Sequence, residues 1–142
     1  MVLRPESVRE RLLKLEEIIS GLQTLAPRSE ADSFSDRREE WAAERGLQLG
    51  AEVLLDIGNH ILSAHFGVSP QDYEDVVTQL AAHGVIDEKL HARLRGIGGF
   101  RNILVHDYLR IDPAKVADAL AKAPRDFSEF ALAIRSWLDR LT

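Results

Sequence analysis

The stretch from Asp36 to Phe66 reads DRREEWAAERGLQLGAEVLLDIGNHILSAHF, and its pattern decides the fold class. Apolar residues recur in it at steps of three and four, which is the spacing along one face of an α-helix. These residues are Trp41, Leu47, Val53, Leu54, Ile57, Ile61 and Leu62. We therefore predict one long helix over about 36–66. Gly46, Gly50 and Gly58 lie inside it. Each costs a helix up to about 1 kcal/mol against alanine, and we interpret them as points of close helix packing.

The same helical period continues on both sides of this stretch. We expect a first helix over about 5–26, a third over about 71–83, a short one over about 88–95 and another over about 100–109. The glycine-rich run at 96–99 should break the chain before the last of these. Asp112-Pro113 has the pattern of a capped helix start, and Pro124 should separate that helix from a final one ending near Leu141. Possible caps between the first two helices are Ser29, Asp32, Ser33 and Ser35.

Strand-like alternation and the spacing of strand–helix–strand units are missing from the sequence. The prediction is an all-α protein, an antiparallel four-helix-type bundle with one or two extra short helices. A chain of 142 residues makes one domain comfortably, so we expect a single helical domain over residues 1–142. Its content of 45% hydrophobic and 29% charged residues is typical of a globular chain and too apolar for a disordered one.

Composition also excludes several classes of protein. The chain has no cysteine, which rules out a disulfide scaffold, a thiolate metal site and a cysteine nucleophile. Its first residues carry charges and a proline where a signal peptide needs an apolar run. No run approaches the roughly 18 consecutive apolar residues of a membrane span. We therefore expect a cytoplasmic protein without a membrane partner.

The sequence offers little for a metal or a cofactor. Five histidines are present, but none forms a His-Glu-x-x-His arrangement, and the step of five between His60 and His65 does not put two ligands on one helical face. The glycines at 96–99 lack the Lys-Ser/Thr pair of a phosphate loop. The net charge of −5 argues against a general nucleic-acid binder, although basic residues outnumber acidic ones between Lys89 and Arg110. We predict no metal site and no cofactor.

One segment, Arg101-Asn102-Ile103-Leu104-Val105-His106-Asp107-Tyr108, combines residues that suit phosphate chemistry. Arginine can hold a phosphate through two hydrogen bonds, and histidine transfers protons near neutral pH. Together they are sufficient for cleavage of an RNA phosphodiester without a metal. Histidine would take the proton of the 2′-hydroxyl, and arginine would stabilise charge on the phosphoryl oxygens.

This segment resembles the Arg-x4-His-x-Tyr signature of the HEPN superfamily, and more narrowly that of HepT-like toxins, which pair with minimal nucleotidyltransferase (MNT) antitoxins. The similarity covers about 5–140, including Glu52-x3-Asp56-x3-His60, Tyr73-x6-Leu80 and the turn at 84–86. It implies a helical-bundle homodimer in a type VII-like toxin–antitoxin pair, acting on RNA as a metal-independent endoribonuclease. Arg101 and His106 would be catalytic together with the flanking Asn102. Tyr108 would be the tyrosine that the antitoxin adenylylates.

Helix geometry adds an expectation of its own. At about 100° per residue, Arg101 and His106 point roughly 140° apart, whereas Asn102 shares a face with His106 and Tyr108 shares one with Arg101. Either the helix is distorted, or two chains pool their motifs across a twofold axis, and we favour the second. A purely structural alternative pairs Arg101 with Asp107 or with an acidic residue of the second helix and buries His106.

The second predicted helix carries a polar stripe of Glu52, Asp56, Asn59 and Ser63, at steps of four, three and four. Such a stripe faces either solvent or a cleft, and in a cleft these groups would hold Arg101 or His106 in place. A second hypothesis for function also stays open. The chain could be a non-catalytic helical module that docks substrate or nucleotide for a partner nucleotidyltransferase, and such a module would not need His106 as a base.

Overall fold

The computed structural model describes residues 2–25, 34 and 36–141, and these residues form helices and connecting turns. The α-helices are α1 (Pro5–Leu25), α2 (Arg37–Ile61), α3 (Tyr73–Ala82), α4 (Glu88–Leu94), α5 (Ile97–His106) and α6 (Pro113–Arg140). A π-helical turn, Leu62–Phe66, extends α2, and a 3-10 turn, Tyr108–Arg110, follows α5. The predicted all-α class is confirmed.

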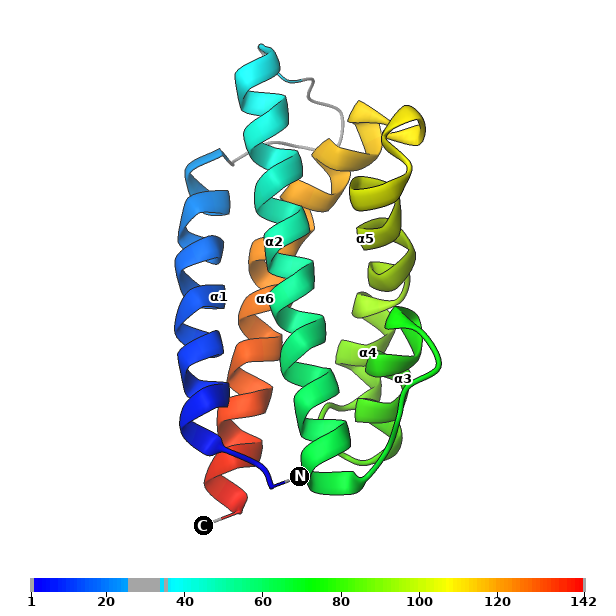
Figure 1. Cartoon of the computed structure of the whole chain (residues 1–142). Coiled ribbons are helices and arrows are strands. Elements are labelled where there is room, and N and C mark those ends of the chain that lie inside the picture. Colours follow the sequence, from blue (N-terminus) through cyan, green and yellow to red (C-terminus); the bar gives the residue numbers. More distant parts are fainter. Residues whose placement is uncertain (1, 26–33, 35, 142) are drawn as a thin grey trace.

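The layers of the bundle (α1, α2, α4 with α5, and α6) run alternately up and down, as the colours of Figure 1 show. α1 packs against α2 and α6, and α2 also contacts α3 and α5. α4 and α5 follow one another on the side of α2 opposite α1, so together they complete the four-helix arrangement (Figure 1). α3 is the extra helix, and it packs against both α4 and α5. Among the described residues, no helix is both long and apolar enough to cross a membrane.

The glycines of α2 lie where neighbouring side chains approach its backbone. A Cβ atom on Gly50 would lie 2.5 Å from the Phe127 ring of α6, and one on Gly58 would lie 2.6 Å from Val76 of α3. Leu22 of α1 would be 2.8 Å from a Cβ on Gly46. The prediction of close helix packing is confirmed, and it explains why a costly residue stands at these places in a long helix.

Several predicted helix ends agree with the structure. Asp36 and Asp112 cap α2 and α6, each accepting a hydrogen bond from the first turn of its helix. The candidate caps Ser29, Asp32, Ser33 and Ser35 lie outside the described residues.

The expected break at Pro124 is wrong, because α6 runs without interruption from Pro113 to Arg140. A proline inside a helix removes one hydrogen bond and crowds the preceding turn, at a cost of about 3 kcal/mol. Leu120 and Phe127, one turn to either side, are buried in the core, and their packing holds the helix together. The helix bends instead of ending, as Figure 1 shows where its orange part meets its red part.

The glycine-rich run at 96–99 also differs from expectation. Only Gly96 adopts the left-handed conformation, with φ of 89°, and α5 begins at Ile97, so Gly98 and Gly99 are helical. The predicted helix also ends early, at His106 instead of about residue 109. Residues 108–110 turn away in a 3-10 conformation, which gives Tyr108 a different direction from the residues of α5.

Candidate active site

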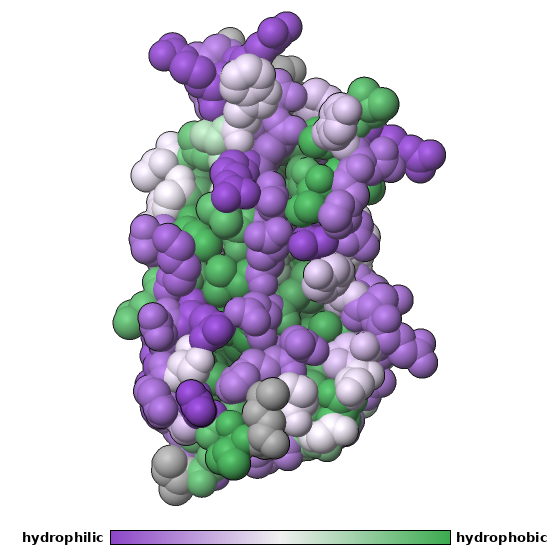
Figure 2. Space-filling model, viewed as in Figure 1, coloured by the Kyte–Doolittle hydropathy of each residue, from purple (hydrophilic) through white to green (hydrophobic). Residues whose placement is uncertain are grey.

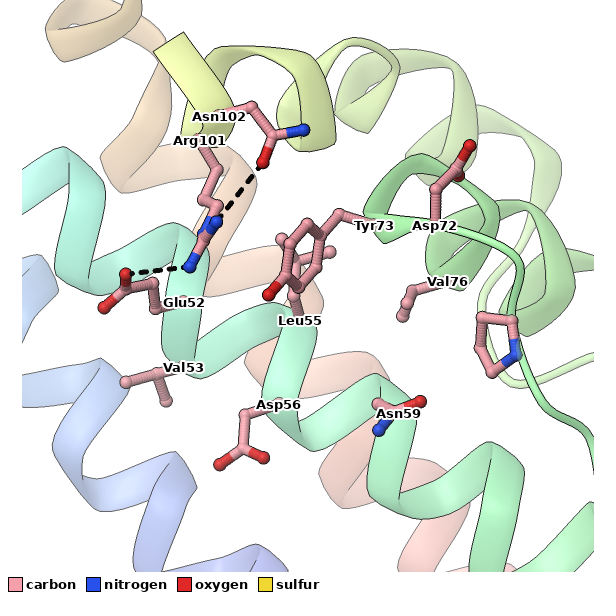
Figure 3. Close-up of a pocket in the computed structure, with 11 residues that line it drawn as sticks. Glu52, Val53, Leu55, Asp56, Asn59, Asp72, Tyr73, Val76, Arg101 and Asn102 are labelled. Carbon is pink, nitrogen blue, oxygen red and sulfur yellow. Dashed lines mark hydrogen bonds and ion pairs between the residues drawn. The ribbon is translucent and has the colours of Figure 1, made fainter. Parts of the chain in front are cut away.

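α5 carries the Arg-x4-His part of the motif, and Arg101 reaches from it toward α2 and α3 (Figure 3). The Arg101 side chain is 13% exposed. Its Nη2 lies 3.4 Å from the Glu52 carboxylate of α2, and its Cζ lies 4.4 Å from the centre of the Tyr73 ring of α3. The Arg101 Nε is buried and has no hydrogen-bond partner among the described residues. The guanidinium is therefore held by residues from two other helices.

Arg101 and His106 lie side by side within one chain. The Nη1 of Arg101 is 3.5 Å from the Nε2 of His106. The expectation that one helix could not bring these groups together is wrong, because it considered only the directions in which the side chains leave the helix. The arginine side chain is long enough to reach around the helix to His106, which is the last residue of α5.

Asn102 belongs to the same cluster but contacts a different partner from the one expected. Its Oδ1 accepts a hydrogen bond from Arg101 Nη1 at 3.2 Å. No hydrogen bond joins Asn102 to His106 in the described part of the chain. The purely structural alternative pairs Arg101 with an acidic residue and buries His106. Its first part agrees with the structure, because Arg101 pairs with the acidic Glu52 of α2. Its second part does not, because His106 is exposed.

Tyr108 lies beyond the end of α5 and is 73% exposed. The expectation that it shares a helical face with Arg101 is wrong, because the α-helix ends two residues earlier. The hydroxyl is accessible from solvent in this position, next in the chain to Asp107, whose carboxylate pairs with Arg110 at 3.3 Å.

The polar stripe lies along a pocket of about 680 Å³ between α2, α3 and α5, except for Ser63, which belongs to the π-helical turn after α2 and does not line the pocket. Glu52, Asp56 and Asn59 line it together with Arg101 and Asn102 (Figure 3). On the face seen in Figure 2, hydrophilic side chains likewise run down the middle of the molecule between more hydrophobic ones. The stripe thus faces a cleft, but its members have separate contacts.

Within the stripe, only Glu52 contacts the motif residues through an ion pair. Asp56 instead accepts from Arg11 Nε of α1 at 2.6 Å, so this carboxylate links α1 to α2. Asn59 is exposed on the pocket wall. In the described residues, no group of three His, Cys, Asp or Glu side chains is placed to hold a metal ion.

Two contacts of the site were missed in the sequence. Tyr73 reads as an apolar residue on the inner side of the third helix, yet its ring is 42% exposed and lies under the Arg101 guanidinium. Glu74 reads as an ordinary surface carboxylate, yet it accepts hydrogen bonds from the backbone N–H groups of Gly96 and Gly98. No local pattern marks either residue, because both contacts join segments more than twenty residues apart.

Comparison with known proteins gives a consistent result. A family model described as "Ribonuclease HepT-like" matches residues 14–134. The chain is 28% identical over 137 residues to the tRNA nuclease HepT of Aphanizomenon flos-aquae, covering 96% of this chain and 92% of that protein. It is 33% identical over 90 residues to the mRNA nuclease HepT of Shewanella oneidensis, covering 63% of this chain and 68% of that protein.

Solved structures share the whole arrangement of helices. The cytosolic protein of unknown function YutE from Bacillus subtilis matches with a TM-score of 0.82 and 25% identity, over 99% of this chain and 94% of that one. The tri-AMPylated Shewanella oneidensis HEPN toxin, in complex with an MNT antitoxin, matches with a TM-score of 0.78 and 26% identity. That match covers 91% of this chain and 96% of the toxin.

Proposed function

The chain belongs to the family of HepT-like ribonucleases in the HEPN superfamily, and on that premise we propose that it is an endoribonuclease whose catalytic pair is Arg101 and His106. The observation that carries the proposal is the 3.5 Å between the Arg101 guanidinium and the His106 imidazole. A phosphate bound at this place meets a cation that can hold it and a nitrogen that can accept a proton.

In the proposed reaction, His106 Nε2 takes the proton from a ribose 2′-hydroxyl, and the 2′-oxygen attacks the adjacent phosphorus. The bond from phosphorus to the 5′-oxygen breaks, which leaves a 2′,3′-cyclic phosphate on one fragment. The departing 5′-oxygen takes a proton from the His106 imidazolium. Arg101 stabilises the negative charge that develops on the phosphoryl oxygens. Since this pair is sufficient for the reaction, we propose cleavage independent of a metal ion.

The neighbouring polar groups have supporting roles in this proposal. Asn102 accepts from the Arg101 guanidinium, and Glu52 pairs with its other terminal nitrogen, so both restrict where the cation points. Asp56 and Asn59 shape the pocket beside it. A positioned arginine needs no reorganisation when charge develops on the phosphate, which is the main benefit of such restraint.

We further propose that a nucleotidyltransferase antitoxin silences this chain by transferring AMP from ATP to Tyr108. The phenolic oxygen would form a bond to the α-phosphorus, pyrophosphate would leave, and the phenolic proton would be released. The exposure of the Tyr108 ring supports this, since the enzyme must reach the hydroxyl. The similar Shewanella toxin is itself AMPylated in its complex with an MNT antitoxin. The attached phosphate would add negative charge two residues after His106, where RNA phosphate must bind.

We propose a homodimer of single-domain chains as the working form. Its support is the resemblance alone, because Arg101 and His106 meet within one chain and need no second copy to form the pair.

Expression in cells tests the proposal and separates it from the non-catalytic alternative. Wild type and His106→Ala are expressed with and without a cognate nucleotidyltransferase. We expect growth arrest and RNA fragments from wild type alone, and neither from His106→Ala or from wild type with its partner. If His106→Ala arrests growth like wild type, the toxicity does not depend on His106 and the nuclease proposal is wrong. If wild type alone leaves RNA intact, the result favours the docking module.

A further inference from the structure

The first turn of α3 contacts the motif helix through two consecutive residues, Tyr73 and Glu74. Neither belongs to the Arg-x4-His-x-Tyr motif, which lies more than twenty residues later in the chain. One residue contacts the side chain of Arg101, and the other contacts the backbone at the start of the helix that carries it.

Glu74 fixes the start of α5. Its Oε2 accepts from Gly96 N and its Oε1 from Gly98 N, each at 2.9 Å. The first N–H groups of a helix have no partner within it and carry a partial positive charge, so a carboxylate is the favoured cap. Gly96, the residue before α5, makes no side-chain cap of its own. α5 is therefore capped by a residue of α3.

The two helices also meet without a side chain between them. A Cβ on Gly98 would lie 2.5 Å from Glu74 N and 2.9 Å from Glu74 Cα, so α5 rests directly on the α3 backbone. α3 in turn packs on α2, where Val76 and Leu80 occupy the space beside Gly58. Together with the direct contact between α2 and α5, this packing sets the distance from α5 to α2, and therefore from Arg101 to its partner Glu52.

Tyr73 supports the guanidinium itself. Hydrogen-bonding groups lie around the edge of that planar cation, with Glu52 at one terminal nitrogen and Asn102 and His106 at the other. The Tyr73 ring lies beneath its face, 4.4 Å from Cζ to the ring centre (Figure 3). An aromatic face attracts a cation, and the attraction is stronger where the pair is shielded from water, as Arg101 is.

We propose that Tyr73 and Glu74 are positioning residues for RNA cleavage. Glu74 holds the start of α5, and the ring face of Tyr73 holds the Arg101 guanidinium beside His106. This inference rests on the proposed nuclease function. It attributes the positioning role of Tyr73 to the aromatic ring and not to the hydroxyl. Substitutions that keep or remove the ring therefore test it.

The first experiment compares Tyr73→Phe with Tyr73→Leu in steady-state RNA cleavage. Tyr73→Phe keeps the ring, so we expect kcat within about twofold of wild type. Tyr73→Leu removes the aromatic face, and we expect kcat to fall about tenfold with little change in KM, in line with usual cation–π strengths. Phenylalanine bearing one, two or three fluorine atoms at position 73 should lower kcat stepwise, because fluorine withdraws electron density from the ring face.

Glu74→Gln tests the second half of the proposal, with Glu88→Gln on α4 as its matched control. An amide can accept one of the two N–H groups but cannot bind both as a carboxylate does. We expect kcat to fall severalfold in Glu74→Gln and to stay at the wild-type value in the control, whose side chain is largely exposed. Equal kcat in the two variants would contradict the role of Glu74.

Nuclear magnetic resonance supplies a readout that does not depend on activity. Ring currents should shift the Arg101 side-chain protons upfield in wild type and in Tyr73→Phe, and the shift should vanish in Tyr73→Leu. Two results overturn the inference, provided that wild type is active and Arg101→Ala is inactive. One is a wild-type kcat in Tyr73→Leu, and the other is a kcat in Tyr73→Phe that is as low as in Tyr73→Leu. An inactive wild type, or an active Arg101→Ala, overturns the nuclease proposal instead.

Discussion

Arg101 is the residue on which the site depends. Its charge is paired with Glu52, its face is covered by Tyr73, and its Nη1 lies between Asn102 and His106. The sequence could identify Arg101, Asn102 and His106, because they belong to one short motif. It could not identify Tyr73 or decide which carboxylate of the polar stripe reaches the arginine, because tertiary packing determines both.

Removing the Glu52 carboxylate should weaken catalysis more than stability. We expect Glu52→Ala to lower kcat about threefold to tenfold, because Arg101 loses one of the groups that restrict it. The free energy of unfolding should change by less than about 1 kcal/mol, as is usual for partly exposed ion pairs. The measurement is RNA cleavage alongside urea unfolding.

The matched control for Glu52 is Glu16, which pairs with Arg135 between α1 and α6 at 2.8 Å. Glu16→Ala removes a more exposed ion pair away from the motif, so its kcat should equal that of wild type. A loss of kcat in Glu16→Ala as large as in Glu52→Ala would mean that Glu52 acts on stability alone.

Tyr108 should accept AMP without being needed for cleavage. After co-expression with its nucleotidyltransferase, wild type should gain one or more AMP units by mass spectrometry, at about 329 Da each from standard atomic masses. The Tyr108→Phe variant should remain unmodified and toxic in the presence of the partner. Neutralised Tyr108→Phe, with no adduct on wild type, would show that the partner inhibits by binding alone.

Among the helices, α5 is the one whose placement decides the geometry of the site. Gly98 and Gly99 stand next to each other in its first turn and differ in surroundings: a Cβ on Gly98 meets the α3 backbone, whereas one on Gly99 meets nothing within 4 Å. We expect Gly98→Ala to destabilise the fold by about 1–3 kcal/mol, because the added Cβ would clash with the α3 backbone, which cannot rotate away as a side chain can.

Gly99→Ala is the control, and it should leave the fold equally stable or stabilise it by up to about 1 kcal/mol through helix propensity. Urea unfolding of both variants measures the difference. Equal stability of the two variants would mean that α5 does not rest on α3 as the structure has it.

Helix existence could be predicted from the sequence, but two interruptions could not. The apolar period predicts α1, α2 and α6, and the Asp112-Pro113 pattern predicts the start of α6, because those signals are local. Pro124 and the glycines at 98 and 99 likewise favour helix breaks locally, but no break occurs at either place. The burial of Leu120 and Phe127 keeps α6 continuous, and the Glu74 cap stabilises the start of α5. Contacts distant in sequence decide both cases.

At the scale of the whole molecule, the order of the helices follows from length, period and short connections. The antiparallel bundle was therefore predictable, whereas the pocket between α2, α3 and α5 was not. α3 packs against both α2 and α5, the other two helices that line the pocket. No pattern in the sequence predicts its contacts with α5.

The placement of Arg101 beside His106 in one chain also predicts the activity of dimers that combine two different variants. Arg101 and His106 meet within one chain, so a dimer of one Arg101→Ala chain and one His106→Ala chain contains no intact pair. We expect such mixed dimers, isolated with two different affinity tags, to be inactive. Recovery of a substantial part of wild-type activity would show that the two motifs are shared between chains.

Cleavage of RNA by purified protein tests the central claim most directly. Wild type, Arg101→Ala and His106→Ala are incubated with RNA in excess EDTA, and the ends of the fragments are determined. We predict cleavage by wild type alone, with 2′,3′-cyclic phosphate and 5′-hydroxyl ends, from variants that all unfold at similar urea concentrations. Cleavage that persists in folded His106→Ala, or that EDTA abolishes in wild type, would contradict catalysis by the Arg101–His106 pair.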